Sequence, residues 1–186
     1  MEAVAIDTTK TWTVDEYLQL NENPNLQLIN GNLIMSPSPS LFHQQILKNL
    51  FTVIDTLSKK SGDRTYFAPL DVFLDDHNVP QPDLVYVKQE NKNKLSKRGV
   101  EGAPDLVVEI VSPSSSSIDR YEKKELYQKH KVKEFWIIDP GNLTLEIFQL
   151  VKYEYVLAQH LVADGKIKSP LLPALAVDLA ELFAEE

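Results

Sequence analysis

Apolar residues recur along this chain with two periods, one typical of helices and the other typical of strands. Residues 11–20 place a capping threonine, Thr13, ahead of apolar positions at helical spacing, which predicts a short helix. Residues 41–61 repeat apolar side chains every three or four positions and predict the long helix of the domain. We expect two further helices, at residues 119–130 and 176–186.

Shorter apolar stretches, bounded by proline, glycine and asparagine, predict strands. The Asn30-Gly31 pair favours a tight β-hairpin within residues 26–35. Further strands are predicted at residues 65–74, 82–87, 104–111, 134–139, 144–151 and 153–161. The polar segment 88–103 is expected to be a loop.

Strand 104–111, helix 119–130 and strand 134–139 have the order of a βαβ unit, in which the strands run parallel and the crossover is right-handed. The strands on either side are joined by short turns, which favours antiparallel pairing there. We therefore predict an α/β fold in which a mixed β-sheet is flanked by α-helices and continues into a C-terminal β-meander. The length of 186 residues suits a single domain over residues 1–186.

Composition narrows the functional classes. A net charge of −8 argues against a protein that coats nucleic acid nonspecifically, but an enzyme with a local basic patch remains compatible with it. The absence of cysteine excludes disulfides and thiolate metal sites. No apolar run reaches the length that spans a bilayer, and the first residues lack a signal-peptide pattern. We therefore expect a cytoplasmic protein with no membrane partner.

Two predicted strands open on the same Pro-Asp pair, which contributes Asp83 to one strand and Asp105 to the other. Only the second strand carries a further carboxylate, Glu109, inside its apolar run. A buried ionised glutamate is costly unless it is paired or binds a metal. Asp83 and Glu109, on neighbouring strands, are suited to hold one magnesium ion, which prefers oxygen ligands. Aspartate after proline also serves turns, so a structural role for Asp83 and Asp105 stays open.

The predicted crossover helix supplies a candidate cation. Asp119, Lys123 and Tyr127 are spaced by four residues and therefore line one stripe of that helix. Because the crossover lays the helix back over the sheet, we expect Lys123 to reach the face that carries Glu109. Two simpler interpretations remain: Asp119 as a helix cap, and Lys123 as an ordinary surface lysine.

The stretches "QLINGNLIMSPSPSLFH", "VPQPDLVYV" and "GAPDLVVEIVSPSSSSIDRYEKKELYQKHKVKEFWIIDP" together resemble the Uma2 family, formerly a domain of unknown function and abundant in cyanobacteria. The resemblance runs from about Trp12 to Phe183 and ends in "SPLLPALAVDLAELF". The family is assigned to the PD-(D/E)XK nucleases, so the resemblance implies the restriction-endonuclease-like fold.

The resemblance also implies roles for single residues. Asp83 is similar to the first acid of the nuclease motif, and Glu109 to the second. The usual lysine, two residues after the second acid, falls at Val111, which is a departure from the strict pattern. Lys123 occupies the place on the following helix to which the lysine of this family has moved.

Two further positions bear on the site. His43 matches a family position near the start of the long helix, which implies a place at the edge of the site; a capping or packing histidine is the simpler alternative. Gln27 stands where relatives often carry glutamate. If that glutamate contributes to the metal site in relatives, this chain has a weaker or inactive site.

The resemblance implies an endonuclease that uses Mg²⁺ (or Mn²⁺) to hydrolyse phosphodiester bonds of DNA. Nucleases of this fold commonly dimerise to cut two strands, so the resemblance is compatible with a homodimer, and the sequence leaves the oligomeric state open. Asp83 and Glu109 are the expected metal ligands, and Lys123 completes the catalytic set. The expected supporting residues are Asp105, Asp119, Tyr127 and His43. The alternative is a catalytically weak or inactive nuclease-fold module with a binding or regulatory role. The five basic residues in segment 88–103 fit a DNA contact or, more simply, a solvated loop.

Overall fold

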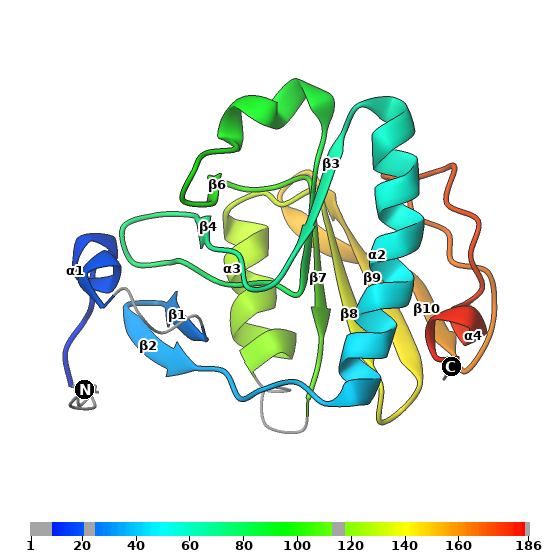
Figure 1. Cartoon of the computed structure of the whole chain (residues 1–186), viewed down its shortest axis with the longest axis horizontal. Coiled ribbons are helices and arrows are strands. Elements are labelled where there is room, and N and C mark those ends of the chain that lie inside the picture. Colours follow the sequence, from blue (N-terminus) through cyan, green and yellow to red (C-terminus); the bar gives the residue numbers. More distant parts are fainter. Residues whose placement is uncertain (1–8, 21–24, 113–117, 185–186) are drawn as a thin grey trace.

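A computed structural model of the 186-residue chain describes residues 9–20, 25–112 and 118–184. Its centre is a six-stranded mixed sheet (Figure 1). In the order in which they lie side by side, the strands are β10 (Glu154–Val162), β9 (Thr144–Val151), β8 (Glu134–Asp139), β7 (Leu106–Ile110), β5 (Leu84–Val87) and β3 (Arg64–Phe67). Strands β7 and β8 pair in parallel and all other neighbours in this sheet are antiparallel, as the predicted mixed sheet requires.

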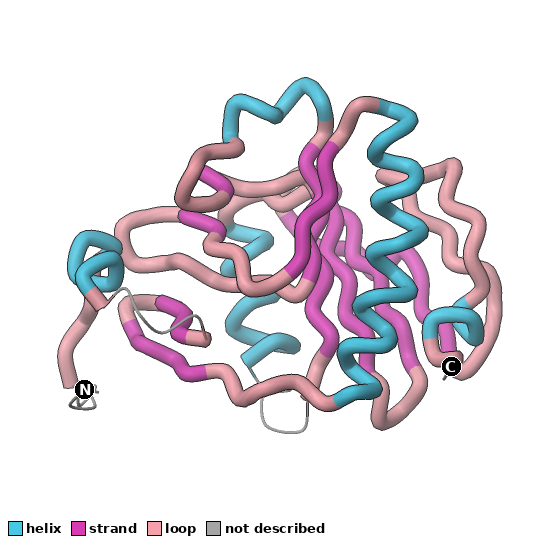
Figure 2. The backbone as a smooth tube through the Cα atoms, in the orientation of Figure 1, coloured by secondary structure: helices cyan, strands magenta, loops and turns pink. Residues whose placement is uncertain are grey.

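Helices cover both faces of the sheet. The side chains of a strand alternate between the two faces, so each face presents its own apolar residues to a helix. Helix α2 (Leu41–Ser61) packs on the face that carries Leu106, Val108 and Ile110 of β7. The opposite face carries Val107 and packs against α3 (Lys123–Lys129), as Figure 2 also shows. The long helix ends as predicted, since Gly62 follows it with a φ of 81°, in the left-handed region.

The predicted βαβ unit is confirmed, with a change at the start of its helix. The sequence predicted one helix over residues 119–130. In the structure a π-helical turn, η2 (Ile118–Glu122), leads directly into α3. Single π-helical turns within helices often occur at functional sites.

A smaller unit lies beside the sheet. It contains α1 (Val14–Gln19), which is capped by Thr13 in a capping box, and the antiparallel pair β1 (Leu26–Ile29) and β2 (Asn32–Met35). The hairpin between these strands turns at Asn30-Gly31, where φ is 51° and 74°. Such positive angles suit the Asn-Gly pair and confirm the predicted turn.

The prediction of one strand over residues 65–74 is wrong. Strand β3 ends before Pro69, which has no N–H to donate to a strand ladder. The chain then forms β4 (Val72–Phe73), which pairs in parallel with β6 (Val100–Glu101) in a separate two-stranded sheet. The segment 88–103, predicted as a loop, contains regular secondary structure: strand β6 and the 3₁₀-helix η1 (Gln89–Lys94).

The predicted meander is confirmed, but the helix predicted over residues 176–186 is shorter in the structure, because Asp178 caps it and residues 176–178 are not helical. β9 and β10 form the antiparallel meander, and the short helix α4 (Leu179–Leu182) begins after the capping side chain of Asp178. Within the described residues, no helix is both long and apolar enough to cross a membrane.

Candidate active site

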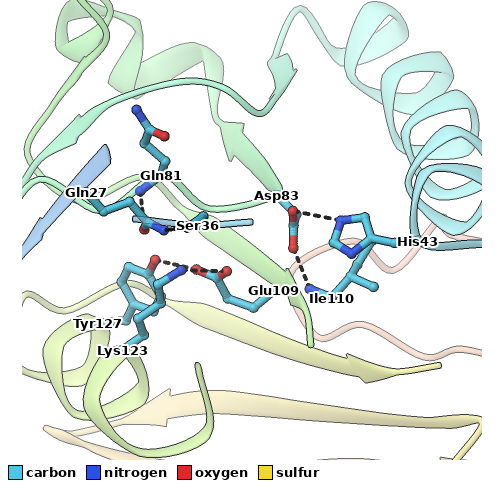
Figure 3. Close-up of polar contacts among 9 residues, drawn as sticks. All are labelled: Gln27, Ser36, His43, Gln81, Asp83, Glu109, Ile110, Lys123 and Tyr127. Carbon is cyan, nitrogen blue, oxygen red and sulfur yellow. Dashed lines mark hydrogen bonds and ion pairs between the residues drawn. The ribbon is translucent and has the colours of Figure 1, made fainter. Parts of the chain in front are cut away.

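Glu109 lies inside β7 and only 2% of it is exposed. Its carboxylate points toward α3, on the face shared with Val107 and Val111 (Figure 3). The ammonium group of Lys123 donates to Oε2 of Glu109 at 2.9 Å, and the hydroxyl of Tyr127 donates to Oε1 at 2.7 Å. The expectation that Lys123 reaches Glu109 is therefore confirmed.

The helix brings both donors to one carboxylate because Lys123 and Tyr127 lie one turn apart on the same stripe. Both residues are buried, with exposures of 3% and 0%. A buried ion pair is maintained by its geometry and by further hydrogen bonds, and loss of one partner leaves an uncompensated charge. Glu109 is thus linked to two successive turns of α3.

Asp83 lies directly before β5, beside the end of β7. Its Oδ2 accepts a hydrogen bond from the backbone N–H of Ile110 at 2.7 Å, one residue beyond Glu109. Its Oδ1 lies 3.0 Å from Nε2 of His43. The side chain of Asp83 is 18% exposed, against 3% for that of Glu109. Asp83 is therefore the more accessible of the two carboxylates.

The first turn of α2 positions His43. Ser40 caps this helix by accepting a hydrogen bond from the backbone N–H of His43, while the imidazole of His43 turns to Asp83. His43 is therefore not the cap of the helix, which is Ser40, and its imidazole contacts the candidate metal ligand Asp83.

The carboxylate pair has a donor set that suits magnesium. Mg²⁺ prefers oxygen ligands, binds through one or two carboxylates and keeps several waters. Asp83 and Glu109 supply two carboxylates from adjacent strands of the sheet. Among the residues described by the structure, no group of three or more His, Cys, Asp or Glu side chains is arranged to hold a metal. The residues fit a two-carboxylate Mg²⁺ site completed by water, not an all-protein cage.

A polar network supports the segment that leads to Asp83. Gln27 of β1 donates from Nε2 to Oγ of Ser36 at 2.6 Å, and its Oε1 accepts from the backbone N–H of Gln81 at 2.9 Å. The side chain of Gln81 in turn donates to Asp71 at 2.8 Å. From the sequence, Gln27 was named only as a departure from relatives. Gln27 contacts Gln81, which lies two residues before Asp83, and this contact between distant segments cannot be predicted from periodicity.

Asp105 lies directly before β7, four residues and therefore about 13 Å from Glu109 along the strand, so the structure does not bring the two side chains together. Its carboxylate accepts from the backbone N–H of Lys88 at 2.8 Å, from Asn91 at 2.9 Å and from Lys133 at 2.8 Å. Burial by itself raises the pKa of Asp105, but the hydrogen bonds from Lys133 and Asn91 lower it overall. These contacts give Asp105 a structural environment.

The remaining predicted positions are placed as follows. Val111 is 5% exposed and packs in the core on the α3 side, where a lysine of the usual motif would share the face of Glu109. The side chain of Asp119 lies outside the described residues.

From the sequence, no role was predicted for Arg120, although it precedes Lys123 by three residues on the same helical segment. That spacing was the available signal.

The basic segment 88–103 precedes the start of β7 and lies at the top of Figure 1, whereas Glu109 belongs to the last residues of β7, at the other end of that strand. Several of its cations have partners within the chain. Lys94 donates to the carbonyl oxygen of Ala103 at 2.7 Å, and Arg98 pairs with Glu101 at 2.7 Å. The segment is therefore not part of the environment of the carboxylate pair.

Comparison with known proteins places this geometry in context. The sequence profile of a family described as "Uma2: Putative restriction endonuclease" matches residues 14–180. A crystal structure described as that of "a putative nuclease belonging to DUF820", from Anabaena variabilis ATCC 29413, superposes with a TM-score of 0.76 at 24% sequence identity. That alignment covers 92% of this chain and 97% of the other, and it shows a shared fold. No curated protein matches the chain.

Proposed function

Because this chain belongs to the Uma2 family, we propose that it is a Mg²⁺- or Mn²⁺-dependent endonuclease that hydrolyses phosphodiester bonds of DNA. The family description supports nuclease function; the metal and the DNA substrate are the finer part of the proposal. One observation supports it most directly. A glutamate buried inside a strand is paired with a lysine and a tyrosine, directly beside a second, more accessible carboxylate.

Each residue has a proposed role that follows from its contacts. Asp83 and Glu109 would hold the metal, which would polarise the phosphodiester and lower the pKa of an attacking water. Lys123 supplies positive charge in a buried environment, where it stabilises negative charge that develops at the scissile phosphate. Tyr127 orients the carboxylate of Glu109 through its hydroxyl, and His43 does the same for Asp83 through its imidazole.

The test is cleavage of plasmid and branched DNA with Mg²⁺ or Mn²⁺. Wild type is compared with Glu109→Gln and Lys123→Ala, each purified identically and checked for folding by circular dichroism. Lys129→Ala is the matched control, because Lys129 belongs to the same helix and its side chain is 68% exposed. We expect cleavage by wild type and by the control, and cleavage lowered on the order of 10³-fold in the other two. Equal cleavage by all four proteins would identify a contaminating nuclease and would refute the proposed nuclease activity of this chain.

A second function, binding or regulation by an inactive nuclease fold, is favoured by Val111, the valine at the position of the usual lysine. It predicts that the chain does not bind divalent metal. Calorimetric titration with Mg²⁺ and Mn²⁺ at millimolar concentration distinguishes the two functions. Binding that disappears in Asp83→Asn supports the enzyme, whereas absence of heat in wild type supports the inactive module.

The proposal includes a homodimer, because two copies of the site can cut the two strands of a duplex together. Light scattering of the purified chain, with and without DNA, measures this directly. A mass that stays at 21.1 kDa in both samples would remove the dimer from the proposal without affecting the nicking of single strands.

A further inference from the structure

Arg120 occupies an unusual position in the turn that precedes Lys123. It belongs to the π-helical turn η2, and its guanidinium holds two carboxylates on different strands. Nη2 donates to Oδ2 of Asp139 at 2.7 Å, and Nη1 donates to Oε2 of Glu146 at 2.5 Å. All three side chains are only partly exposed, at 27%, 13% and 23%. Partial burial and the planar fork of arginine make this a stronger contact than an ordinary surface pair.

The strand register relates this contact to the candidate site. Glu109 of β7 lies opposite Ile137 of β8, and Ile137 lies opposite Glu146 of β9. Residues directly opposite one another share a face of the sheet. Glu109 and Glu146 therefore stand in one row on the face of α3, separated by about 10 Å, which is two strand spacings. Lys123 binds one end of the row and Arg120 binds the other.

Asp139 provides a fixed anchor for Arg120. Its Oδ1 accepts from the backbone N–H groups of Gly141 and Asn142 at 3.0 and 3.1 Å, and its Oδ2 also accepts from the Asn142 side chain at 2.9 Å. The carboxylate is thus oriented by the turn that joins β8 to β9 before it meets Arg120. Arg120 therefore attaches η2 to β8 and β9, whose positions in the sheet are set by strand pairing and not by α3.

The helix that carries Lys123 depends on such attachments. α3 has seven residues, and isolated helices of that length are unstable in water. A shift of one residue would rotate Lys123 by about 100° and remove its ammonium group from Glu109. We propose that Arg120 is a positioning residue, whose two ion pairs fix η2 on β8 and β9 so that Lys123 and Tyr127 meet Glu109.

The catalytic consequence of this inference rests on the proposed nuclease function. In Arg120→Ala we expect kcat for DNA cleavage to fall by about 10- to 100-fold, the usual effect of losing a residue that orients a catalytic group, with little change in KM. Arg120→Lys should recover part of the rate, because a single ammonium group can hold one of the two carboxylates well. Arg98→Ala is the matched control: it removes an arginine–carboxylate pair formed within segment 88–103, between Arg98 and Glu101, and should leave kcat unchanged.

A second measurement does not need activity. Two-dimensional ¹H–¹⁵N spectra of the lysine ammonium groups report the environment of Lys123, whose signal is assigned from its loss in Lys123→Ala. We expect that signal to shift or broaden in Arg120→Ala, to return partly in Arg120→Lys and to stay unchanged in Arg98→Ala. An unchanged Lys123 signal in a folded Arg120→Ala protein would overturn the inference, whatever happens to the rate.

The two measurements separate the two proposals. If wild type does not cleave DNA but the Lys123 signal responds to Arg120, the nuclease function fails and the positioning role stands. If Arg120→Ala does not fold, Glu146→Gln and Arg120→Lys provide milder variants, since each leaves the contact with Asp139 available. No response of Lys123 in either folded variant would then refute the positioning role.

Discussion

Two buried glutamates lie on the central parallel strands, and they differ in almost every other respect. Glu109 is near the end of β7, faces α3 and is paired with a lysine. Glu134 opens β8 at the other end of the pair, opposite Leu106. Its partners are neutral donors: the indole N–H of Trp136 at 2.7 Å, the hydroxyl of Ser169 at 2.5 Å and a backbone N–H at 2.8 Å.

The difference shows that burial of a carboxylate does not by itself indicate a catalytic site. Glu134 is 1% exposed, and burial raises its pKa above the ordinary range because its neutral partners do not fully compensate. It holds the segment around Ser169 and Leu171 against the sheet, which is a structural task. Glu109 has a buried cation and an accessible carboxylate beside it, and this combination is what indicates chemistry.

The largest expected effect separates the two glutamates by activity. Glu109→Gln should lower DNA cleavage on the order of 10³-fold, because it removes a proposed metal ligand and the partner of Lys123. Glu134→Gln should leave cleavage within about threefold of wild type, a bound that follows from its structural role at the other end of the strands. Initial rates on supercoiled plasmid measure both. A larger loss in folded Glu134→Gln than in Glu109→Gln would reverse the comparison.

The next effect concerns stability on the Glu109 side. Lys123→Met should lower the free energy of unfolding by about 3–5 kcal/mol, because it leaves Glu109 buried without a cation. The double variant Glu109→Gln/Lys123→Met removes both charges and should lose much less than the sum of the single changes. Urea denaturation of the four proteins gives the coupling. Additive losses would show that the pair is not coupled in the folded protein.

A smaller effect is expected on the Glu134 side. Ser169→Ala removes the hydroxyl that donates to Glu134 and accepts from the backbone N–H of Leu172. We expect a loss of about 1–3 kcal/mol in the free energy of unfolding, the cost of leaving buried polar groups without a partner. Cleavage at a temperature well below unfolding should be unchanged. A cleavage defect in this variant would mean that the two ends of the strands are coupled.

The smallest effect is a pH dependence specific to Glu134. Because its folded-state pKa is raised above 4.5, the folded protein binds a proton more readily than the unfolded chain. Its contribution to stability therefore increases as pH falls from above the folded pKa toward 4.5, and decreases as pH rises through the same window. As the pH is lowered through that window, the free energy of unfolding of wild type should rise relative to that of Glu134→Gln. A constant or opposite difference would contradict the assigned direction.

The sequence predicted the elements that depend on local pattern. The Asn30-Gly31 hairpin, the long helix before Gly62 and the βαβ unit follow from turn chemistry and periodicity, and the structure confirms all three. The same periodicity placed Lys123 and Tyr127 on one stripe, which made the contact with Glu109 predictable.

The rest depends on contacts between distant segments. Periodicity tells which face a side chain occupies but not which partner it meets there, so the pairing of Arg120 with Glu146 and of Gln27 with Gln81 was not predictable. The same limit explains Asp105, whose Pro-Asp context matches that of Asp83 while its neighbours differ. The split of the strand at residues 65–74 arose because β4 finds its partner in β6, about 28 residues later in the chain.

The parallel pairing of β7 with β8 also sets the time at which a newly made chain completes this site. Asp83 can contact Ile110 once the antiparallel strands β5 and β7 have formed, whereas Glu109 needs the crossover segment to fold back over it. Arg120 gains its ion pair with Glu146 later still, because Glu146 is synthesised 26 residues after it. A chain emerging from the ribosome can therefore place Asp83 beside β7 before Glu109 gains Lys123 and Tyr127, and Arg120 gains Glu146 last, so that partly synthesised protein carries both acids without the cations that pair with them.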